Sequence, residues 1–334
     1  RLHAAFAGDP SELYRNLLLA QRGANGACFE AGRFHIVSAS PESFFRLTDE
    51  RLEVRPMKGT ARRGRWAAED EAQSIRLLGS DQERAQNLRV VQAIAESMGA
   101  IAAPGSVRVE EVLELERLET VWQLTSLFSA VPREATSIVD AVTALFPLCS
   151  FSGTARRRTL EIIALVEPSP RGIYCGAIGY VAPPGFDGPR ADFNVAIRTV
   201  AIDLDEGLAE YGVGGGITWD SDSNDEYDEA RSKAQLLAER RPEFELWETL
   251  RWEPTEGFWL LEEHLERVAA SADYFGYTWD REEAVAALNE AVAGCEGTCA
   301  VRLSVARNGP LEAHVLGGEM AKLWDRDSGP TVQV

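Results

Sequence analysis

The chain has 334 residues, 45% of them hydrophobic and 26% charged, which suits one large globular domain followed by a smaller one. Its 53 acidic and 34 basic residues give a formal charge of −19, which disfavours non-specific binding to nucleic acid or anionic lipid. No apolar run reaches the roughly 18 residues of a membrane helix, and the start has no signal-peptide layout. We expect a cytoplasmic protein with no nucleic-acid or membrane partner. Because it begins at Arg1 rather than Met, we also expect a fragment.

The first elements that the sequence predicts are two strands and a long helix. Residues 33–38 and 51–55 alternate between apolar and polar side chains around a polar turn, so we expect a hairpin. Residues 83–98 repeat apolar side chains at helical intervals before Gly99, which predicts an amphipathic helix. The residues expected on its buried face are Leu88, Val91, Ala95 and Met98.

Helices and strands are mixed in the middle of the chain. Residues 137–140 have the pattern of a capping box, and residues 156–166 have helical periodicity. Residues 173–182 and 193–203 are typical of two buried strands. An acidic run then leads into a helix that we expect to continue to Leu237.

Arg240-Arg241-Pro242 interrupts the chain and divides it into two expected domains, residues 1–241 and 242–334. The second domain begins with a strand and two helices, expected at residues 244–252, 262–275 and 281–293.

Two short motifs carry the most specific signal. They are Ser40-Pro41-Glu42 and Pro56-Met57-Lys58-Gly59-Thr60, which place Glu42 and Lys58 16 positions apart. Such a pair on neighbouring strands forms either a structural ion pair or a catalytic acid and amine, and residue types alone leave both open. Lys58 is one of three lysines in a chain that otherwise uses arginine. Unlike arginine, a desolvated lysine can lose its proton and become a nucleophile.

The pair resembles the Ser-Pro-Glu and Pro-Ile-Lys-Gly-Thr motifs of the chorismate-utilising enzymes, with the spacing of their aminodeoxychorismate synthases. The related anthranilate synthases carry alanine in place of the lysine. The resemblance implies that Lys58 attacks C2 of chorismate while Glu42, as general acid, protonates the departing C4 hydroxyl. Ammonia then adds at C4 and expels the lysine. The product, 4-amino-4-deoxychorismate, belongs to the folate and p-aminobenzoate pathway.

Further segments between residues 26 and 240 resemble the same family. A planar guanidinium suits a carboxylate, and a glycine turn can present backbone N–H groups to one, although three glycines alone indicate only a tight turn. The residues that the resemblance implies in substrate binding are Thr60, Tyr174, Arg198, Gly214, Gly216 and Lys233.

The resemblance weakens at the implied Mg²⁺ site. Family members use two glutamates, one matched by Glu229 and the other replaced here by Gln86, so that Glu161 is a candidate for the missing ligand. An amide weakens a site for a hard cation. Gln123 also stands where the family commonly carries histidine. A slow enzyme and a non-catalytic chorismate-binding relative both remain open, while Lys58 disfavours a third alternative, anthranilate synthase.

The segment that opens the second domain, residues 244–267, resembles the start of a fold-type IV pyridoxal-phosphate (PLP) enzyme such as aminodeoxychorismate lyase. His264 and Arg267 lie on one face of the predicted helix, where a matching arginine in such enzymes approaches cofactor or substrate anions. Taken alone, the two are typical of surface residues. The cofactor needs a Schiff-base lysine, and Lys322, the only lysine after Lys233, lacks that family's motif. We expect a partial domain that does not bind PLP productively.

The resemblance as a whole implies an α/β fold of two packed β-sheets surrounded by helices, followed by a partial α+β domain. The implied function is that of an aminodeoxychorismate synthase. Its expected partners are chorismate and a glutamine amidotransferase subunit that supplies ammonia.

Overall fold

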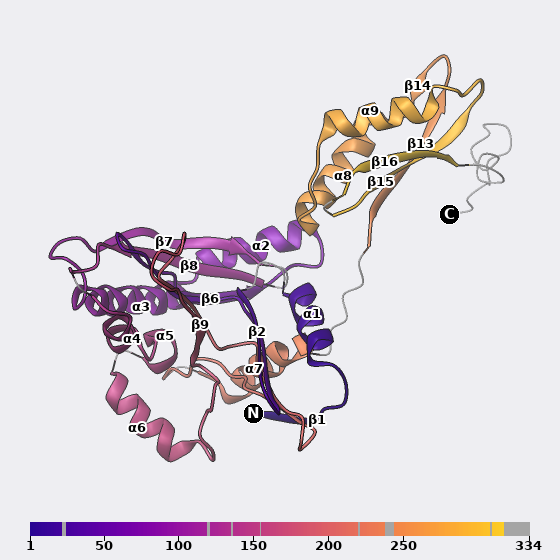
Figure 1. The fold of residues 1–334 in the computed structure, drawn as a ribbon. Coiled ribbons are helices and arrows are strands. Elements are labelled where there is room, and N and C mark those ends of the chain that lie inside the picture. The colour runs from indigo at the N-terminus through magenta and orange to yellow at the C-terminus, as the bar shows by residue number, and fades with distance from the viewer. Residues whose placement is uncertain are drawn as a thin grey trace. The chain divides into compact units, whose positions relative to one another are not determined.

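A computed structural model describes residues 1–21, 25–118, 121–134, 136–153, 155–219, 221–237, 244–307 and 309–316, without the side chains of Ser232 and Leu236. The predicted chain break at residues 240–242 and Lys322 lie outside the described residues. The chain divides into two compact units, Arg1–Arg241 and Pro242–Val334 (Figure 1).

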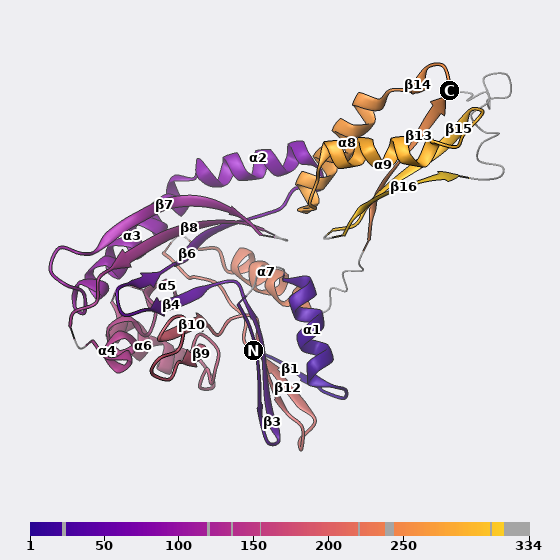
Figure 2. The same ribbon diagram turned by 45° about the horizontal axis from the view of Figure 1, so that its top comes forward.

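Unit 1 contains two antiparallel sheets. The five-stranded sheet has the order β1-β12-β11-β3-β2. Its strands are β1 (Leu2–Ala5), β2 (Asn25–Ala31), β3 (Phe34–Ser40), β11 (Thr199–Asp203) and β12 (Leu208–Tyr211). Helix α1 (Pro10–Ala20) packs along β3 and β2, as both views show, and buries Leu17 and Ala20 against Val37 and Val200 (Figures 1 and 2).

The seven-stranded sheet has the order β6-β8-β5-β4-β10-β9, with β7 also paired to β8. Its strands are β4 (Ser43–Leu47), β5 (Leu52–Val54), β6 (Met57–Arg62), β7 (Arg108–Arg117), β8 (Val121–Ala130), β9 (Ala177–Val181) and β10 (Ala191–Val195). Apolar side chains of β4, β5 and β8 form the larger core with those of α3 (Asp81–Gly99), including Phe44, Phe45, Phe128 and Ile94.

The other helices of unit 1 are α2 (Ala67–Leu78), α4 (Ile138–Leu145), α5 (Cys149–Ser152), α6 (Arg156–Val166) and α7 (Ser223–Ala234), followed by η1 (Gln235–Leu237). The predicted helix at 156–166 and the capping box are both confirmed. Ser137 and Asp140 exchange hydrogen bonds through their side chains and backbone N–H groups at the start of α4. The reciprocal pair satisfies N–H groups that a helix start otherwise leaves without partners.

The long predicted helix is confirmed as α3, but its predicted buried face is wrong in part. Met98 is buried, whereas Leu88 is 48% exposed. The buried face instead follows Asn87, Val90 and Ile94. Asn87 is buried because its side chain donates to the carbonyl of Lys58 at 3.0 Å and accepts from Ser126 at 3.0 Å. A hydrogen-bonded polar residue therefore takes a position that periodicity assigns to an apolar one.

The predicted hairpin is also wrong, because β3 and β5 belong to different sheets. The true hairpin joins β4 to β5 through the pairs Arg46↔Glu53 and Leu47↔Leu52. Pro41, which has no N–H to donate, follows directly on β3 at the point where the chain leaves that sheet.

The predicted strand at 193–203 is two strands, β10 and β11, again in different sheets. The break lies at residues 196–198, where Arg198 has a positive φ of 50°. The predicted strand at 173–182 is shorter than expected, since β9 begins at Ala177. The α/β fold class with two sheets and surrounding helices is nevertheless confirmed.

Unit 2 contains a four-stranded antiparallel sheet with the order β14-β13-β15-β16. Its elements are β13 (Leu246–Glu253), β14 (Gly257–Phe258), α8 (Leu261–Phe275), α9 (Arg281–Val292), β15 (Cys299–Val305) and β16 (Leu311–Leu316). Both helices pack on one face of the sheet, where Leu265 and Leu288 meet Leu250 and Val301. The predicted strand and helices of this α+β part are confirmed within a few residues.

Among the described residues, no single helix is long and apolar enough to cross a membrane. One bent pair of segments, Ile138–Ser152 with Arg156–Val166, meets the criterion only when the two are taken together.

Candidate active site

Glu42 lies between the two sheets of unit 1, just after β3, and is only 3% exposed. Its Oε1 accepts hydrogen bonds from the backbone N–H of Met57 at 3.3 Å and from the hydroxyl of Ser150 at 3.4 Å. Burial raises the pKa of Glu42 to about 8, because these hydrogen bonds and the nearby Lys58 only partly offset the loss of hydration. The carboxyl group is therefore mostly protonated at neutral pH.

Lys58 lies on β6, next to the residue whose N–H binds Glu42. The side-chain amide of Asn87 on α3 donates a hydrogen bond to the backbone carbonyl of Lys58. The Lys58 amino group lies against the glycine-rich turn after β12, residues 212–216 (the glycine turn). A Cβ atom at Gly216 would lie 2.5 Å from Lys58 Nζ, so only glycine leaves room for this amine. Lys58 also interacts electrostatically with Glu42 and with Glu83. The structure thus brings the two residues of the sequence motifs into one site.

Arg198 lies between β10 and β11, where the chain crosses from the seven-stranded sheet to the five-stranded sheet, and Glu42 lies at the opposite crossing, between β3 and β4. Its backbone carbonyl accepts from the N–H of Ala39 at 3.1 Å, and the carbonyl of Glu42 accepts from the N–H of Val195 at 3.0 Å. The two crossings are therefore hydrogen-bonded to each other. The Nη1 atom of Arg198 is buried without a hydrogen-bond partner among the described residues, and burial lowers the pKa of this guanidinium. An unpaired buried guanidinium is suited to an anionic ligand.

Tyr174 packs against the same glycine turn. A Cβ atom at Gly214 would lie 3.1 Å from the Tyr174 hydroxyl, and one at Gly212 would collide with the ring at 2.2 Å. Burial raises the pKa of Tyr174, with a further contribution from Cys175, so the phenol keeps its proton. Cys175 itself has a positive φ of 61°, which is uncommon for a residue other than glycine. The unusual backbone at Cys175 thus accompanies a close contact between the Tyr174 side chain and the glycine turn.

The carboxylates of Glu226 and Glu229, both on α7, lie against Gly215 in the middle of the glycine turn. A Cβ atom at Gly215 would lie 2.8 Å from Glu226 Oε2 and 3.4 Å from Glu229 Oε2. Lys233 pairs with Glu229 at 2.6 Å and donates to the carbonyl of Gly214 at 3.1 Å. The Oε2 atom of Glu226 is buried with no hydrogen-bond partner in the described part of the chain.

Glu83 and Glu226 were missed by sequence reasoning. A Cβ atom at Gly59 would lie 3.3 Å from Glu83 Oε2, so Glu83 lies beside the Lys58 motif. Burial raises the pKa of Glu83, Lys58 opposes that shift, and Glu229 and Glu226 add to it. The available signal was spacing: Glu83 precedes Gln86, and Glu226 precedes Glu229, by three positions on a helix, which places each pair on one face.

A divalent cation fits part of this arrangement. Within the described residues, no group of three or more His, Cys, Asp or Glu side chains is arranged to hold a metal ion as the side chains lie. The unpartnered Oε2 of Glu226, beside Glu229, is nevertheless the kind of hard anionic donor that Mg²⁺ prefers.

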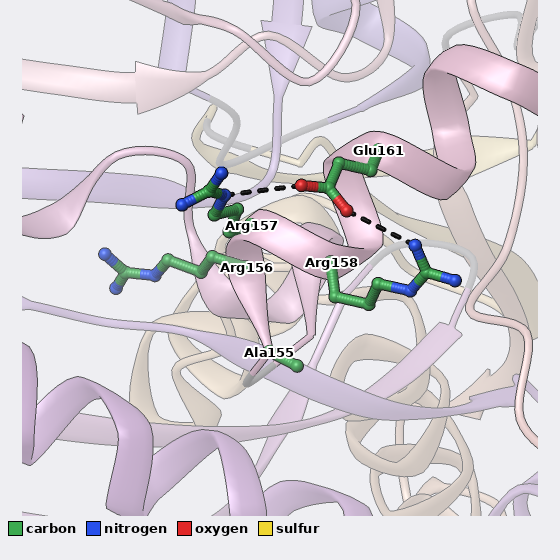
Figure 3. Close-up of a pocket in the computed structure, with 5 residues that line it drawn as sticks. All are labelled: Ala155, Arg156, Arg157, Arg158 and Glu161. Carbon is green, nitrogen blue, oxygen red and sulfur yellow. Dashed lines mark hydrogen bonds and ion pairs between the residues drawn. The ribbon is translucent and has the colours of Figure 1, made fainter.

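Glu161 and Thr60 have other partners. Figure 3 shows Glu161 on α6 between Arg157 and Arg158, and it is bonded to each at 3.3 Å. These residues line a hollow at the start of α6, and the described contacts do not join Glu161 to Glu229 or Lys58. Thr60 donates to Gln123 at 3.0 Å, and Gln123 donates to the carbonyl of Gly59 at 2.7 Å. Gln123 therefore braces the Lys58 motif.

In unit 2, Glu248 of β13 joins both residues that the sequence singled out on α8. His264 Nδ1 lies 2.7 Å from Glu248 Oε2, and Arg267 Nη2 donates to the same oxygen at 2.7 Å. Burial opposes ionisation of Glu248, but the hydrogen bonds from Arg267 and His264 prevail and lower its pKa. The network ties the helix to the sheet.

Residues 1–239 match the family model described as chorismate binding enzyme, and residues 245–316 match amino-transferase class IV. The chain therefore belongs to the chorismate-binding enzyme family, and an aminotransferase class IV-like part follows.

Named relatives include two kinds of synthase. The chain is 38% identical over 229 residues to the aminodeoxychorismate synthase of Streptomyces griseus, which covers 68% of this chain and 31% of that protein. It is 36% identical over 239 residues to anthranilate synthase component 1 of Mycobacterium tuberculosis, covering 69% and 44% respectively. The crystal structure of anthranilate synthase component I from Streptococcus pneumoniae matches with a TM-score of 0.63 at 30% identity, covering 71% of this chain and 51% of that one. The chain thus spans about half of these relatives or less.

Proposed function

We propose that unit 1 is an aminodeoxychorismate synthase-like domain that converts chorismate and ammonia to 4-amino-4-deoxychorismate and water. The supporting observation is the pairing of a buried acid that holds its proton near neutrality, Glu42, with an amine in electrostatic range, Lys58. The chain is about equally identical to an aminodeoxychorismate synthase and to an anthranilate synthase, so identity does not choose between the two reactions. We base the choice on Glu42 and Lys58.

In the proposed first step, the neutral amine of Lys58 forms a bond to C2 of chorismate. Both conjugated ring double bonds shift, from C1=C2 to C1=C6 and from C5=C6 to C4=C5. The C4–O bond breaks, and Glu42 delivers its proton to the departing oxygen, which leaves as water. In the second step, ammonia bonds to C4, both ring double bonds return to their original positions, and the C2–N bond to Lys58 breaks. Lys58 leaves as the neutral amine, and the new C4 ammonium group gives one proton to Glu42, so the enzyme ends as it began.

Substrate binding is assigned to the residues around the glycine turn. Arg198 offers a guanidinium whose Nη1 has no partner among the described residues, which suits a carboxylate of chorismate. Backbone N–H groups at Gly214 and Gly216, with the Tyr174 hydroxyl and Lys233, would orient the second carboxylate. Thr60, through Gln123, holds the strand that carries Lys58.

Mg²⁺ is the cofactor that we propose, with Glu229 and Glu226 as residues that would hold it. The bound ion would offset carboxylate charge on the substrate. Glu161, engaged by Arg157 and Arg158, is a poor candidate for a ligand. As partner, we propose a glutamine amidotransferase subunit that delivers ammonia.

We propose that unit 2 does not carry PLP chemistry. Arg267, the residue suited to a cofactor anion, is engaged by Glu248, and Lys322 lacks the lysine motif of the family. Incubation with PLP followed by borohydride reduction should leave no pyridoxyl adduct on Lys322.

The test supplies chorismate, ammonium and Mg²⁺ and follows products by mass spectrometry. Wild-type protein should form aminodeoxychorismate, and Lys58→Ala should not, with its thermal unfolding unchanged. Lys322→Ala makes the same chemical change outside unit 1 and should keep the activity. An adduct of chorismate less one water on the tryptic peptide that contains Lys58 would mark the covalent step.

Two results would contradict this function. Formation of anthranilate would assign the chain to the other synthase. Calorimetric binding of chorismate without any product, at every Mg²⁺ concentration, would make it a binding protein.

A further inference from the structure

We infer that Asn87 and Gln123 are positioning residues for Lys58: their side-chain amides bind the two backbone carbonyls of a β-bulge and thereby set the direction of the lysine amine. This inference rests on the proposed function, in which that amine reacts with chorismate. It adds two residues that act through the backbone of β6.

The bulge lies in the pairing of β6 with β8. The register shifts by one residue there, between the pairs Met57↔Thr125 and Thr60↔Gln123. Two residues of β6, Lys58 and Gly59, therefore lie opposite a single residue of β8. Gly59 suits the bulge because its φ of 106° lies in a region that other residues rarely adopt. Since a bulge re-aims the side chains of its strand, the local backbone determines where the Lys58 amine points.

Both carbonyls of the bulge accept a hydrogen bond from a side-chain amide. Asn87 Nδ2 donates to the carbonyl of Lys58 at 3.0 Å, and Gln123 Nε2 donates to that of Gly59 at 2.7 Å. The Oε1 atom of Gln123 accepts from the Thr60 hydroxyl at 3.0 Å, which leaves its nitrogen for Gly59. A bulge disrupts the local ladder of hydrogen bonds, so these amides satisfy carbonyls at the disrupted point.

The Asn87 amide is itself held in one orientation. Asn87 is only 2% exposed, and its Oδ1 accepts from the hydroxyl of Ser126 at 3.0 Å. The same hydroxyl oxygen accepts from the N–H of Leu113 at 3.3 Å. Because a hydroxyl has one proton and Ser126 gives it to Asn87, the amide nitrogen must face the carbonyl of Lys58. The bulge is therefore tied to α3, β8 and β7.

The acid is tied to the same stretch of backbone. The N–H of Met57, directly before the bulge, donates to Glu42 Oε1 at 3.3 Å. A shift of the bulge would therefore change the position of the Lys58 amine relative to the acid. Small displacements of reacting groups are costly, so the two amides should matter for the rate. Asn87 acts through the Lys58 backbone, which makes it a positioning residue.

Asn87→Leu in the full chain removes one donor at similar side-chain volume and tests this inference. We expect kcat to fall about 10- to 100-fold, while KM for chorismate changes by less than about 3-fold, because the proposed substrate contacts are untouched. Gln123→Leu, which frees the other carbonyl, should have the same effect. Gln92→Leu removes an amide at an exposed position of α3 and should leave both constants unchanged.

A second measurement does not depend on turnover. The chain has three lysines, so lysine isotopically labelled at its carbonyl carbon gives three NMR signals, and Lys58→Arg identifies the signal of Lys58. Loss of the hydrogen bond in Asn87→Leu should move this signal upfield. The signals of Lys233 and Lys322 should stay in place. A general loss of stability would not select the Lys58 signal.

Wild-type kcat in Asn87→Leu or in Gln123→Leu, or a Lys58 signal that does not move, would overturn the inference. If Asn87→Leu were poorly folded by circular dichroism, Ser126→Ala would decide, because it removes the hydroxyl that orients Asn87 and should shift the same signal. An unmoved signal in a chain that makes aminodeoxychorismate would keep the function and refute the positioning role. A shifted signal in a chain whose wild type makes none would refute the function and keep the bulge assignment.

Discussion

The amino group of Lys58 lies so close to the backbone of Gly216 that a Cβ atom there would stand 2.5 Å from Nζ. Gly216→Ala should therefore move the amine while leaving the backbone in place, since the far end of a lysine shifts easily. We expect turnover to fall about 100-fold, as for other small displacements of a reacting group.

Initial rates and the unfolding temperature of Gly216→Ala check this prediction together. Gly99→Ala is its control, because no atom lies within 4 Å of a Cβ atom at that position. A wild-type rate in Gly216→Ala would show that the reaction does not depend on the position of the Lys58 amine.

We expect deprotonation of Glu42 to set the alkaline limit of the reaction rate. Because burial raises its pKa to about 8, the acid form that donates a proton is lost as pH rises through that value, and the rate should fall with it. Glu42→Gln should lower turnover by about 10²- to 10⁴-fold and abolish this limb. A rate that stays constant well above pH 8 in the wild type would exclude Glu42 as the acid.

The same group should make folding pH-dependent in a defined direction. A folded pKa raised from 4.5 to about 8 means that the folded state binds more protons than the unfolded state between these values. The free energy of unfolding should therefore decrease as pH rises through that window, and Glu42→Gln should lack this component. Thermal melts of the two proteins across the window measure the difference.

Gly179 should be irreplaceable for packing rather than for chemistry. It lies on β9 opposite Phe193 of β10, and a Cβ atom there would be 2.1 Å from the carbonyl oxygen of Asp192. Gly179→Ala must part the two strands, and we expect a loss of about 3 kcal/mol in the free energy of unfolding. Denaturant titration against Gly99→Ala would measure it, and an unchanged midpoint would argue against this close approach.

Glu248 should stabilise unit 2 by joining β13 to α8. Glu248→Ala leaves His264 and Arg267 without their shared acceptor, at a cost of about 1 to 3 kcal/mol. Since its folded pKa is lowered, this contribution is present above its ordinary pKa and is lost as pH falls through the folded value. Glu263→Gln, an exposed change on the same helix, should leave the unfolding midpoint of unit 2 unchanged.

Periodicity predicted helices well and sheet membership poorly. The bounds of α6 followed from its sequence, because a helix is a local structure. The split of residues 193–203 into β10 and β11 did not, since apolar residues continue through it and only the backbone at Arg198 changes direction. Motif resemblance found Glu42 and Lys58, but not the placement of Glu83, which depends on how α3 packs on β6.

The two hydrogen-bonded crossings between the sheets have a consequence for engineering and for evolution. Glu42 and Arg198 each lie at a point where the chain changes sheets, and Ala39 and Val195 tie the two points together. An insertion or deletion of one residue in either passage would turn the following strand over and misalign acid and guanidinium at once. Sequence length in these two short stretches should therefore tolerate less change than the surface loops of the same domain.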